Sequence, residues 1–180
     1  MNGVDVLGVL LAAGAGRRYG SPKVLAHDGA WLQTAVTALA DGGCAHVLVV
    51  LGAAIPAQLP GDVSTVVAAD WSSGMGASLR AGLIAATSTA ATHVLVHLVD
   101  TPDVGAGVVA RVLNTRTELA RAGYGGKPRH PVLLGRRHWA AVQQSATGDH
   151  GARDFLRGRP DVVLVECGDL ATGHDHDAPD

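Results

Sequence analysis

Short apolar runs rich in valine and leucine alternate along this chain with alanine-rich stretches of helical spacing. The runs occupy residues 6–13, 46–51, 64–68 and 94–99. Alternation of this kind predicts an α/β protein with right-handed crossovers, in which helices cover both faces of a mainly parallel sheet. The chain has 180 residues, of which 47% are hydrophobic and only 3% aromatic. We therefore expect a single domain whose core is built from Ala, Val and Leu.

The pattern changes in the second half of the chain. A helix is expected over residues 104–121, followed by a turn cluster at 125–128, a short strand at 132–134 and a helix at 136–145. A last strand is expected at 161–165. The polar segment 169–180 has the composition of a frayed tail.

Charge and cysteine content narrow the class of partner. The formal net charge is -2, which gives no basic face for nucleic acid or a membrane surface and favours a small-molecule partner. Cys44 and Cys167 form neither a disulfide framework nor a zinc-type spacing, so we expect both to be reduced and structural. Because we find no signal peptide and no apolar stretch of membrane-spanning length, we expect a cytoplasmic protein.

A glycine-rich loop directly follows the first apolar run. It combines three glycines with three cations: Gly14, Gly16, Gly20, Arg17, Arg18 and Lys23. Glycines let the backbone approach a ligand and form an anion nest, and the added positive charge suits a triphosphate. The spacing is one residue longer than the dinucleotide fingerprint, and the phosphate-loop motif ending in Lys-Ser or Lys-Thr is absent. The alternative is a tight turn with solvated basic side chains.

Asp100 follows the apolar run at 94–99 and precedes Thr101 and Pro102. Ligands of such sheets bind at the carboxyl ends of the strands, where the glycine loop also lies. Mg²⁺ takes one or two carboxylates and leaves its other positions to phosphate and water. Asp100 is therefore a candidate magnesium ligand. The alternative is a turn or capping residue, and Thr101 or Asp103 could likewise cap the helix that follows.

The glycine loop also carries a family resemblance. Its residues match the signature L-A-A-G-x-[SG]-x-R-x-G-x-x-K at Leu11, Ala12, Ala13, Gly14, Gly16, Arg18, Gly20 and Lys23. The chain thus resembles the molybdenum-cofactor nucleotidyltransferase-like family, the MobA-like NTP transferases, although sugar-nucleotide pyrophosphorylases share the motif. The resemblance implies a three-layer α/β/α Rossmann-like nucleotidyltransferase fold. It also implies that Arg18, Lys23 and the metal ligand Asp100 are catalytic. The residues that would bind the nucleotide are Leu11, Ala12, Ala13, Gly14, Gly16, Arg18 and Lys23.

Further segments are similar to motifs of the same family. Residues 74–83 resemble G-M-x-x-S-L-x-x-G-L, which implies that Gly76 and Ser78 lie beside the nucleotide. His130 in H-P-V-L, with Gly151 and Arg153 in G-D-x-G-A-R, would bind the acceptor. Arg129 departs from the family, because a glycine usually precedes the histidine. As alternatives, His130 is an ordinary strand histidine, and Arg153 a surface residue paired with Asp149 or Asp154.

The chain ends in a segment similar to the family's terminal D-I-D-T-P-E-D. Asp175 and Asp177 would join Asp100 in holding the metal, while His176 and Ala178 replace the usual Ile and Thr. A solvated tail is an equal alternative. The alternating His174 and His176 also allow a transition-metal site, which we rank below both.

Together these features predict transfer of CMP from CTP to a phosphorylated acceptor, with Mg²⁺ as cofactor and pyrophosphate as product. The resemblance to the cytidylyl branch favours CTP and implies molybdopterin cofactor as acceptor. Within the single domain, residues 1–122 would bind the nucleotide and residues 123–180 would bind the acceptor. Alternatives are GTP, a sugar phosphate or coenzyme precursor as acceptor, or a non-catalytic carrier working with a molybdoenzyme or its chaperone. A nicotinamide-dependent oxidoreductase is disfavoured, since Leu51-Gly52 stands where an acidic residue is expected.

Overall fold

A single seven-stranded sheet runs through the chain in the computed structural model, which describes residues 5–178. The strand order is β3-β2-β1-β4-β6-β5-β7. The strands are β1 (Val6–Leu11), β2 (His46–Leu51), β3 (Ser64–Val67), β4 (His93–Leu98), β5 (Leu119–Tyr124), β6 (Lys127–Gly135) and β7 (Val163–Glu166). β1 pairs in parallel with both β2 and β4, and only β6 runs against its neighbours. The expected mainly parallel sheet is confirmed.

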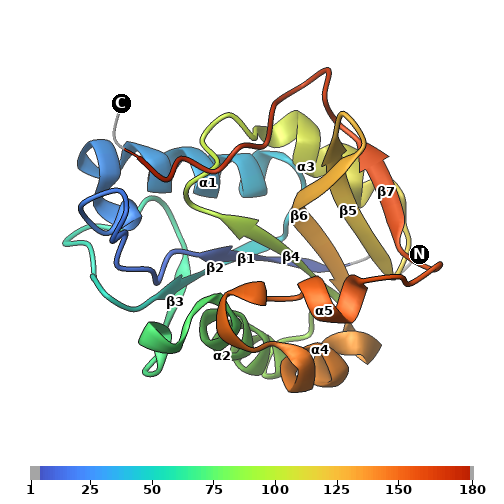
Figure 1. Cartoon of the computed structure of the whole chain (residues 1–180), viewed down its shortest axis with the longest axis horizontal. Coiled ribbons are helices and arrows are strands. Elements are labelled where there is room, and N and C mark those ends of the chain that lie inside the picture. Colours follow the sequence, from blue (N-terminus) through green and yellow to red (C-terminus); the bar gives the residue numbers. More distant parts are fainter. Residues whose placement is uncertain (1–4, 179–180) are drawn as a thin grey trace.

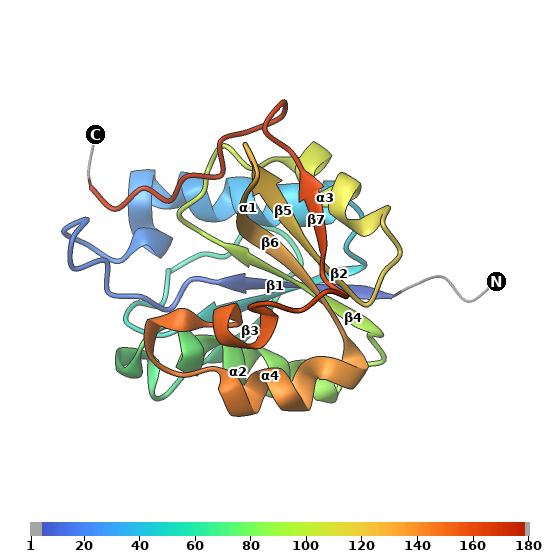
Figure 2. The same ribbon diagram turned by 45° about the vertical axis from the view of Figure 1, so that its right-hand side comes forward.

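Helices cover both faces of this sheet, as Figures 1 and 2 show. One face carries α1 (Ala30–Asp41) and α3 (Ala106–Leu113), and the other carries α2 (Met75–Thr87), α4 (Trp139–Ser145) and α5 (Arg153–Leu156). Side chains alternate between the faces along each strand, so that Leu95 enters the core under α1 while Val94 and Val96 enter the core over α2. The three-layer architecture predicted from the sequence is confirmed.

The helix expected over residues 104–121 is wrong in its second half. α3 begins at Ala106 with Gly105 as its capping residue, and it ends at Leu113. Residues 119–124 form β5, which pairs with β6 through a two-residue turn at Gly125 and Gly126. Both turn glycines have positive φ, +60° and +74°, as this type of hairpin turn requires. β6 is accordingly longer than the strand expected at 132–134, and the division at residue 122 falls inside β5.

The segment 169–178 is not the frayed tail that its composition suggests. It runs from β7 across the α1 and α3 face toward the glycine loop (Figure 1). Asp103 holds its start, because one carboxylate oxygen accepts hydrogen bonds from the backbone N–H and the hydroxyl of Thr172, each at 2.6 Å. Neither Asp103 nor Thr101 caps α3, which corrects that expectation. In residues 5–178 no helix has the length and apolarity needed to cross a membrane.

Candidate functional site

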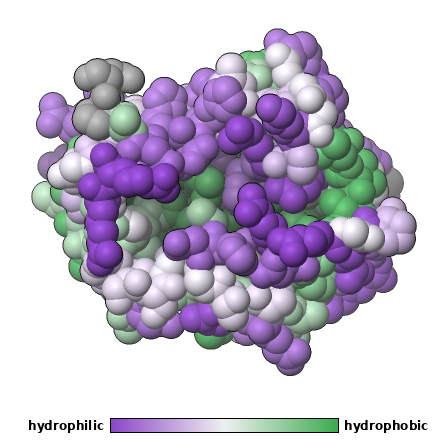
Figure 3. All heavy atoms as spheres, viewed as in Figure 1, coloured by the Kyte–Doolittle hydropathy of each residue, from purple (hydrophilic) through white to green (hydrophobic). Residues whose placement is uncertain are grey.

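A pocket of about 380 Å³ opens where β1 and β4 end. Its walls come from the glycine loop, the start of α2 and the residues that follow β4, and two carboxylates from the second half of the chain complete it. In Figure 3 the hollow has apolar residues on its floor and hydrophilic residues along its rim. The carboxyl ends of the strands therefore form the site, as the topology predicts.

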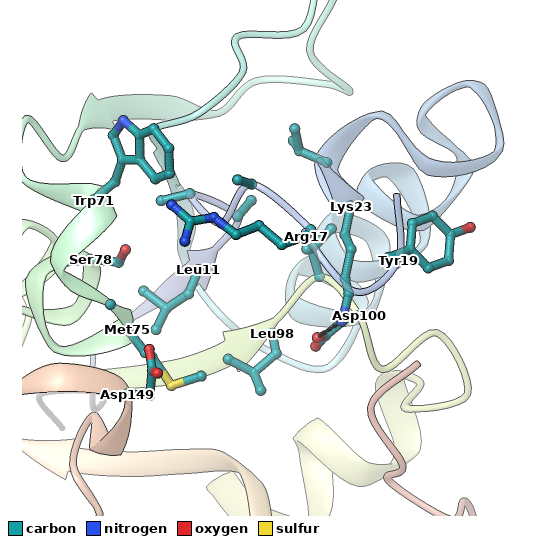
Figure 4. Close-up of a pocket in the computed structure, with 18 of the residues that line it drawn as sticks. Leu11, Arg17, Tyr19, Lys23, Trp71, Met75, Ser78, Leu98, Asp100 and Asp149 are labelled. Atoms are coloured by element: carbon teal, nitrogen blue, oxygen red, sulfur yellow. Dashed lines mark hydrogen bonds and ion pairs between the residues drawn. The ribbon is translucent and has the colours of Figure 1, made fainter. Parts of the chain in front are cut away.

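The glycine loop takes a shape that requires glycine at two positions. Gly16 has a φ of +61°, and a Cβ there would lie 1.8 Å from the backbone oxygen of Ser21. Gly20 has a φ of +100° and donates its N–H to the oxygen of Gly16 over 2.7 Å. The loop places Leu11, Ala12, Ala13, Gly14, Gly16, Arg17 and Arg18 along the pocket wall. Arg17, one of the loop's three cations but outside the family signature, extends toward the Trp71 end of the pocket (Figure 4).

Lys23 lies between two carboxylates at the other end of the pocket. Its ammonium nitrogen is 2.8 Å from Asp100 Oδ2 and 2.8 Å from Asp177 Oδ1. Burial alone would lower the pKa of Lys23, but the hydrogen bonds that its ammonium donates to these two carboxylates, with their negative charges, outweigh burial and raise the pKa. The tail thus brings Asp177 to Asp100, two residues separated by most of the second half of the chain. Asp177 also pairs with Arg18 at 3.2 Å.

The wall opposite the glycine loop comes from η2 (Trp71–Ser73) and the first turn of α2. Trp71, Ser72, Met75 and Ser78 line the pocket there, and Ser78 is buried. Gly76 does not line it, because that residue packs against Thr147, whose nitrogen would lie 2.8 Å from a Cβ. The start of this helix faces the cavity, a position that favours bound anions.

Asp149 is a pocket residue that sequence reasoning did not assign. It lies in η4 (Gly148–His150), and Figure 4 shows its carboxylate beside Met75. The sequence could have pointed to Asp149, since it belongs to the G-D-x-G-A-R segment, which the family resemblance links to the acceptor. The two acceptor residues of that segment, Gly151 and Arg153, do not line the pocket. Gly151 packs on Met75, whose sulfur would lie 3.1 Å from a Cβ.

His130 lies in β6, away from the pocket wall. Burial, assisted by the positive charges of Arg121 and His97, lowers the pKa of His130 to about 3, so its ring is neutral near pH 7. The pairing suggested for Arg153 is not formed: Asp154 pairs with His150 at 3.0 Å and with Arg157 at 3.1 Å. Asp149 has no ion pair with Arg153 among residues 5–178.

Asp175 is not brought to Asp100. Its carboxylate pairs with Arg129, the residue that departs from the family pattern, at 3.3 Å. Arg129 therefore helps to hold the tail on the second half of the sheet. In the described part of the chain, no group of three or more His, Cys, Asp or Glu side chains is arranged to hold a metal ion. A transition-metal site formed by the alternating His and Asp residues accordingly has no support in the geometry of residues 174–177.

Replacing Arg129 with alanine is expected to lower the free energy of unfolding by less than about 1 kcal/mol. Both partners are partly exposed, with 31% of the Arg129 side chain and 47% of the Asp175 side chain accessible, and such pairs are weak. Urea unfolding of Arg129→Ala, Asp175→Ala and the double variant measures their coupling. A coupling of several kcal/mol would contradict the assignment of a surface pair.

The fold is that of a Rossmann-like nucleotidyltransferase. Residues 8–163 match the MobA-like NTP transferase domain, and the chain belongs to that family. It is 41% identical to a nicotine blue oxidoreductase from Paenarthrobacter nicotinovorans, over 96% of this chain and 92% of that protein.

Two solved structures illustrate the likeness of the fold. The crystal structure of Rv0371c from Mycobacterium tuberculosis H37Rv matches with a TM-score of 0.75 and 26% identity, over 91% of this chain and 88% of that one. The 2-C-methyl-D-erythritol 4-phosphate cytidylyltransferase of Thermus thermophilus matches with a TM-score of 0.61 and 23% identity, over 94% and 92%. The latter shows a shared fold alone.

Proposed function

We propose that this nucleotidyltransferase-family chain transfers CMP from CTP to a phosphorylated acceptor and releases pyrophosphate. The observation that carries the proposal is the meeting of Lys23, Asp100 and Asp177 at one end of a pocket whose wall is a cationic glycine loop. Transfer between phosphates requires positioning and charge neutralisation more than proton removal. This pocket supplies both.

A magnesium ion suits the carboxylates at this end of the pocket. Asp100 Oδ1 is buried and has no hydrogen-bond partner among the described residues, while Oδ2 already faces a cation. Asp100 and Asp177 would hold the ion, since Mg²⁺ binds through one or two carboxylates and completes its shell with phosphate and water. When bound, it would neutralise charge that develops on the phosphates.

The chain's own residues divide the remaining work. Backbone N–H groups of the glycine loop would hold the phosphates, with Arg18 beside them. Lys23 keeps its proton because two carboxylates raise its pKa, so its ammonium stays charged for contact with a phosphate oxygen. A phosphate nucleophile is already ionised at neutral pH, and no general base is needed.

The choice of CTP rests on the L-A-A-G loop. Trp71 lines the end of the pocket away from Lys23 and offers an aromatic face there for a nucleotide base. Molybdopterin cofactor is the acceptor that we propose, in the cytoplasm, with a molybdoenzyme or its chaperone as recipient. A non-catalytic carrier would keep this pocket without turnover, and pyrophosphate release distinguishes the two.

A second function is favoured by one comparison. The 41% identical relative is an oxidoreductase of nicotine blue, and an oxidoreductase of a related aromatic compound is our second candidate. The end of β2 argues against nicotinamide binding in the usual way, since Gly52 occupies the place of the acidic ribose ligand. A Cβ at Gly52 would lie 2.6 Å from the Trp71 Cβ, so the backbone and the indole are in close contact there.

A thermal-shift comparison of CTP, GTP, ATP, UTP and NAD, with and without Mg²⁺, tests the proposal. At ten times its dissociation constant CTP is expected to stabilise the fold by about 1.4 kcal/mol. This corresponds to a rise in Tm of about 3–6 °C for a chain of this size. We expect the rise with CTP to depend on Mg²⁺.

Each of the other outcomes would assign a different function to this chain. Selective stabilisation by NAD would replace the transferase with the oxidoreductase, and a preference for GTP would move the chain to the guanylyl branch. A magnesium-independent response to CTP would remove the metal from the proposal.

A further inference from the structure

Arg121 projects from β5 into a row of the sheet that is otherwise apolar. Val96 on β4 lies opposite Val132 on β6, and Val132 lies opposite Arg121 on β5. Residues directly opposite each other in antiparallel strands point to the same face. Val96 and Val132 belong to the core over α2 and α4, so Arg121 points toward that face as well.

The guanidinium of Arg121 has no carboxylate partner in residues 5–178. Its one hydrogen bond to another residue there is from Nε to the backbone oxygen of Arg129, at a long 3.4 Å. Arg121 is partly buried, and burial, with the nearby positive charge of Arg153, lowers its pKa. A partly buried charge without a partner destabilises the fold that contains it.

Other positive charge gathers at the same place. Arg153 begins α5, and its neighbours Ala152, just before the helix, and Leu156, at its end, belong to the core on this face. Asp154, the acidic residue next to it, is already paired with His150 and Arg157. His130 is close enough for Arg121 to contribute to its lowered pKa, and it remains a neutral hydrogen-bonding group near pH 7.

This group of cations adjoins the nucleotide pocket. β6 lies beside β4, whose last residue Leu98 lines the pocket, and Asp149 of the pocket lies four residues before Arg153. An anion held here would therefore sit next to the nucleotide but on the side of the second half of the chain. That is the half of the chain in which the acceptor is expected to bind.

We propose that Arg121, together with Arg153, forms a subsite for the dianionic phosphate of the acceptor. This inference rests on the proposed function and adds to it a binding residue, Arg121, and the chemical class of the group bound, a phosphomonoester. The guanidinium donates in a fork that matches two phosphate oxygens. A phosphate bound there would supply the negative charge that residues 5–178 do not.

Inorganic phosphate is the probe for the test, added to protein already saturated with CTP and Mg²⁺. Saturation with CTP separates the subsite from the places where the nucleotide's own phosphates bind. Arg121→Gln is compared with Lys127→Gln, which removes the same charge from an exposed position on the same hairpin. Tm is followed as phosphate is added.

We expect phosphate to raise the Tm of the wild-type protein and of Lys127→Gln alike. In Arg121→Gln the affinity for phosphate should fall about tenfold or more, because hydrogen bonds to a charged group are lost. Without phosphate, Arg121→Gln should melt no lower than the wild type, since it loses an unpaired charge. A response to phosphate equal to that of the wild type, or a lower Tm without phosphate, would overturn the subsite.

Failure of the proposed function gives a different result. If CTP produces no shift, the phosphate series is run without nucleotide on Arg121→Gln and on Arg18→Ala, which alters the glycine loop. Loss of the response in Arg121→Gln alone supports the subsite independently of CTP. Loss of the phosphate response in Arg18→Ala alone would place the phosphate in the glycine loop and overturn the proposed subsite.

Discussion

Turnover of CTP should fall by about a hundred- to a thousandfold when Asp100 is replaced with alanine. Asp100 contacts Lys23 at 2.8 Å, and its second oxygen is buried without a partner among the described residues. Removing one preorganised charge contact commonly costs about 2.7–4 kcal/mol of transition-state stabilisation. The measurement is pyrophosphate release at saturating CTP and Mg²⁺, with molybdopterin cofactor as acceptor. Lys23→Ala is expected to lose turnover to a similar degree.

Two further variants make this prediction specific. Asp100→Asn keeps the shape of the side chain but removes the charge, so it should share the loss if charge is what matters. Asp62→Ala removes an exposed carboxylate from a loop elsewhere and should keep wild-type turnover. Near wild-type rates for Asp100→Ala under these conditions would remove the metal assignment.

The sequence predicts the first half of the fold well, because its strands carry their own signal. Residues 46–51 read His-Val-Leu-Val-Val-Leu and form β2 with the expected bounds. β5 reads Leu-Ala-Arg-Ala-Gly-Tyr, with none of the β-branched residues that mark a strand. Its conformation is set by pairing with β6 across the hairpin and with the distant β7, and this pairing overrides the helical preference of the segment.

The site can likewise be divided into residues whose position follows from the local sequence and residues whose position depends on partners elsewhere in the chain. The glycine loop and Asp100 follow strands and could be placed at one edge of the sheet from the sequence. Composition and local pattern alone could not place the tail, because its partners Asp103, Arg129 and Lys23 lie far away along the chain. Only the family resemblance put Asp177 beside Asp100. Asp175 and Asp177 look equivalent in the sequence, yet one meets Arg129 and the other meets Lys23.

Another buried group that the sequence did not single out is His97. The residue lies in β4 with 0% of its surface exposed, and neither ring nitrogen has a hydrogen-bond partner among the described residues. Burial lowers the pKa of His97 to about 4, although Asp103 opposes the shift. The unfolded chain binds this proton near pH 6.5, so below that pH the unfolded state takes up more protons than the folded state. The free energy of unfolding therefore falls as the pH falls from about 7 toward 4.

Replacing His97 with leucine should remove this contribution. Between pH 8 and pH 4.5, the wild-type protein should lose about 2.5 kcal/mol more unfolding free energy than His97→Leu, as proton linkage with these two pKa values requires. Groups that do not interact with His97 titrate equally in both proteins and cancel in the difference. At pH 8 His97→Leu should be at least as stable, since it removes two buried ring nitrogens that have no hydrogen-bond partner in residues 5–178. Urea unfolding at both pH values measures the effect, and His97→Gln serves as a second non-titrating variant. If the difference in unfolding free energy between the wild type and both variants does not change with pH, His97 does not titrate in this range.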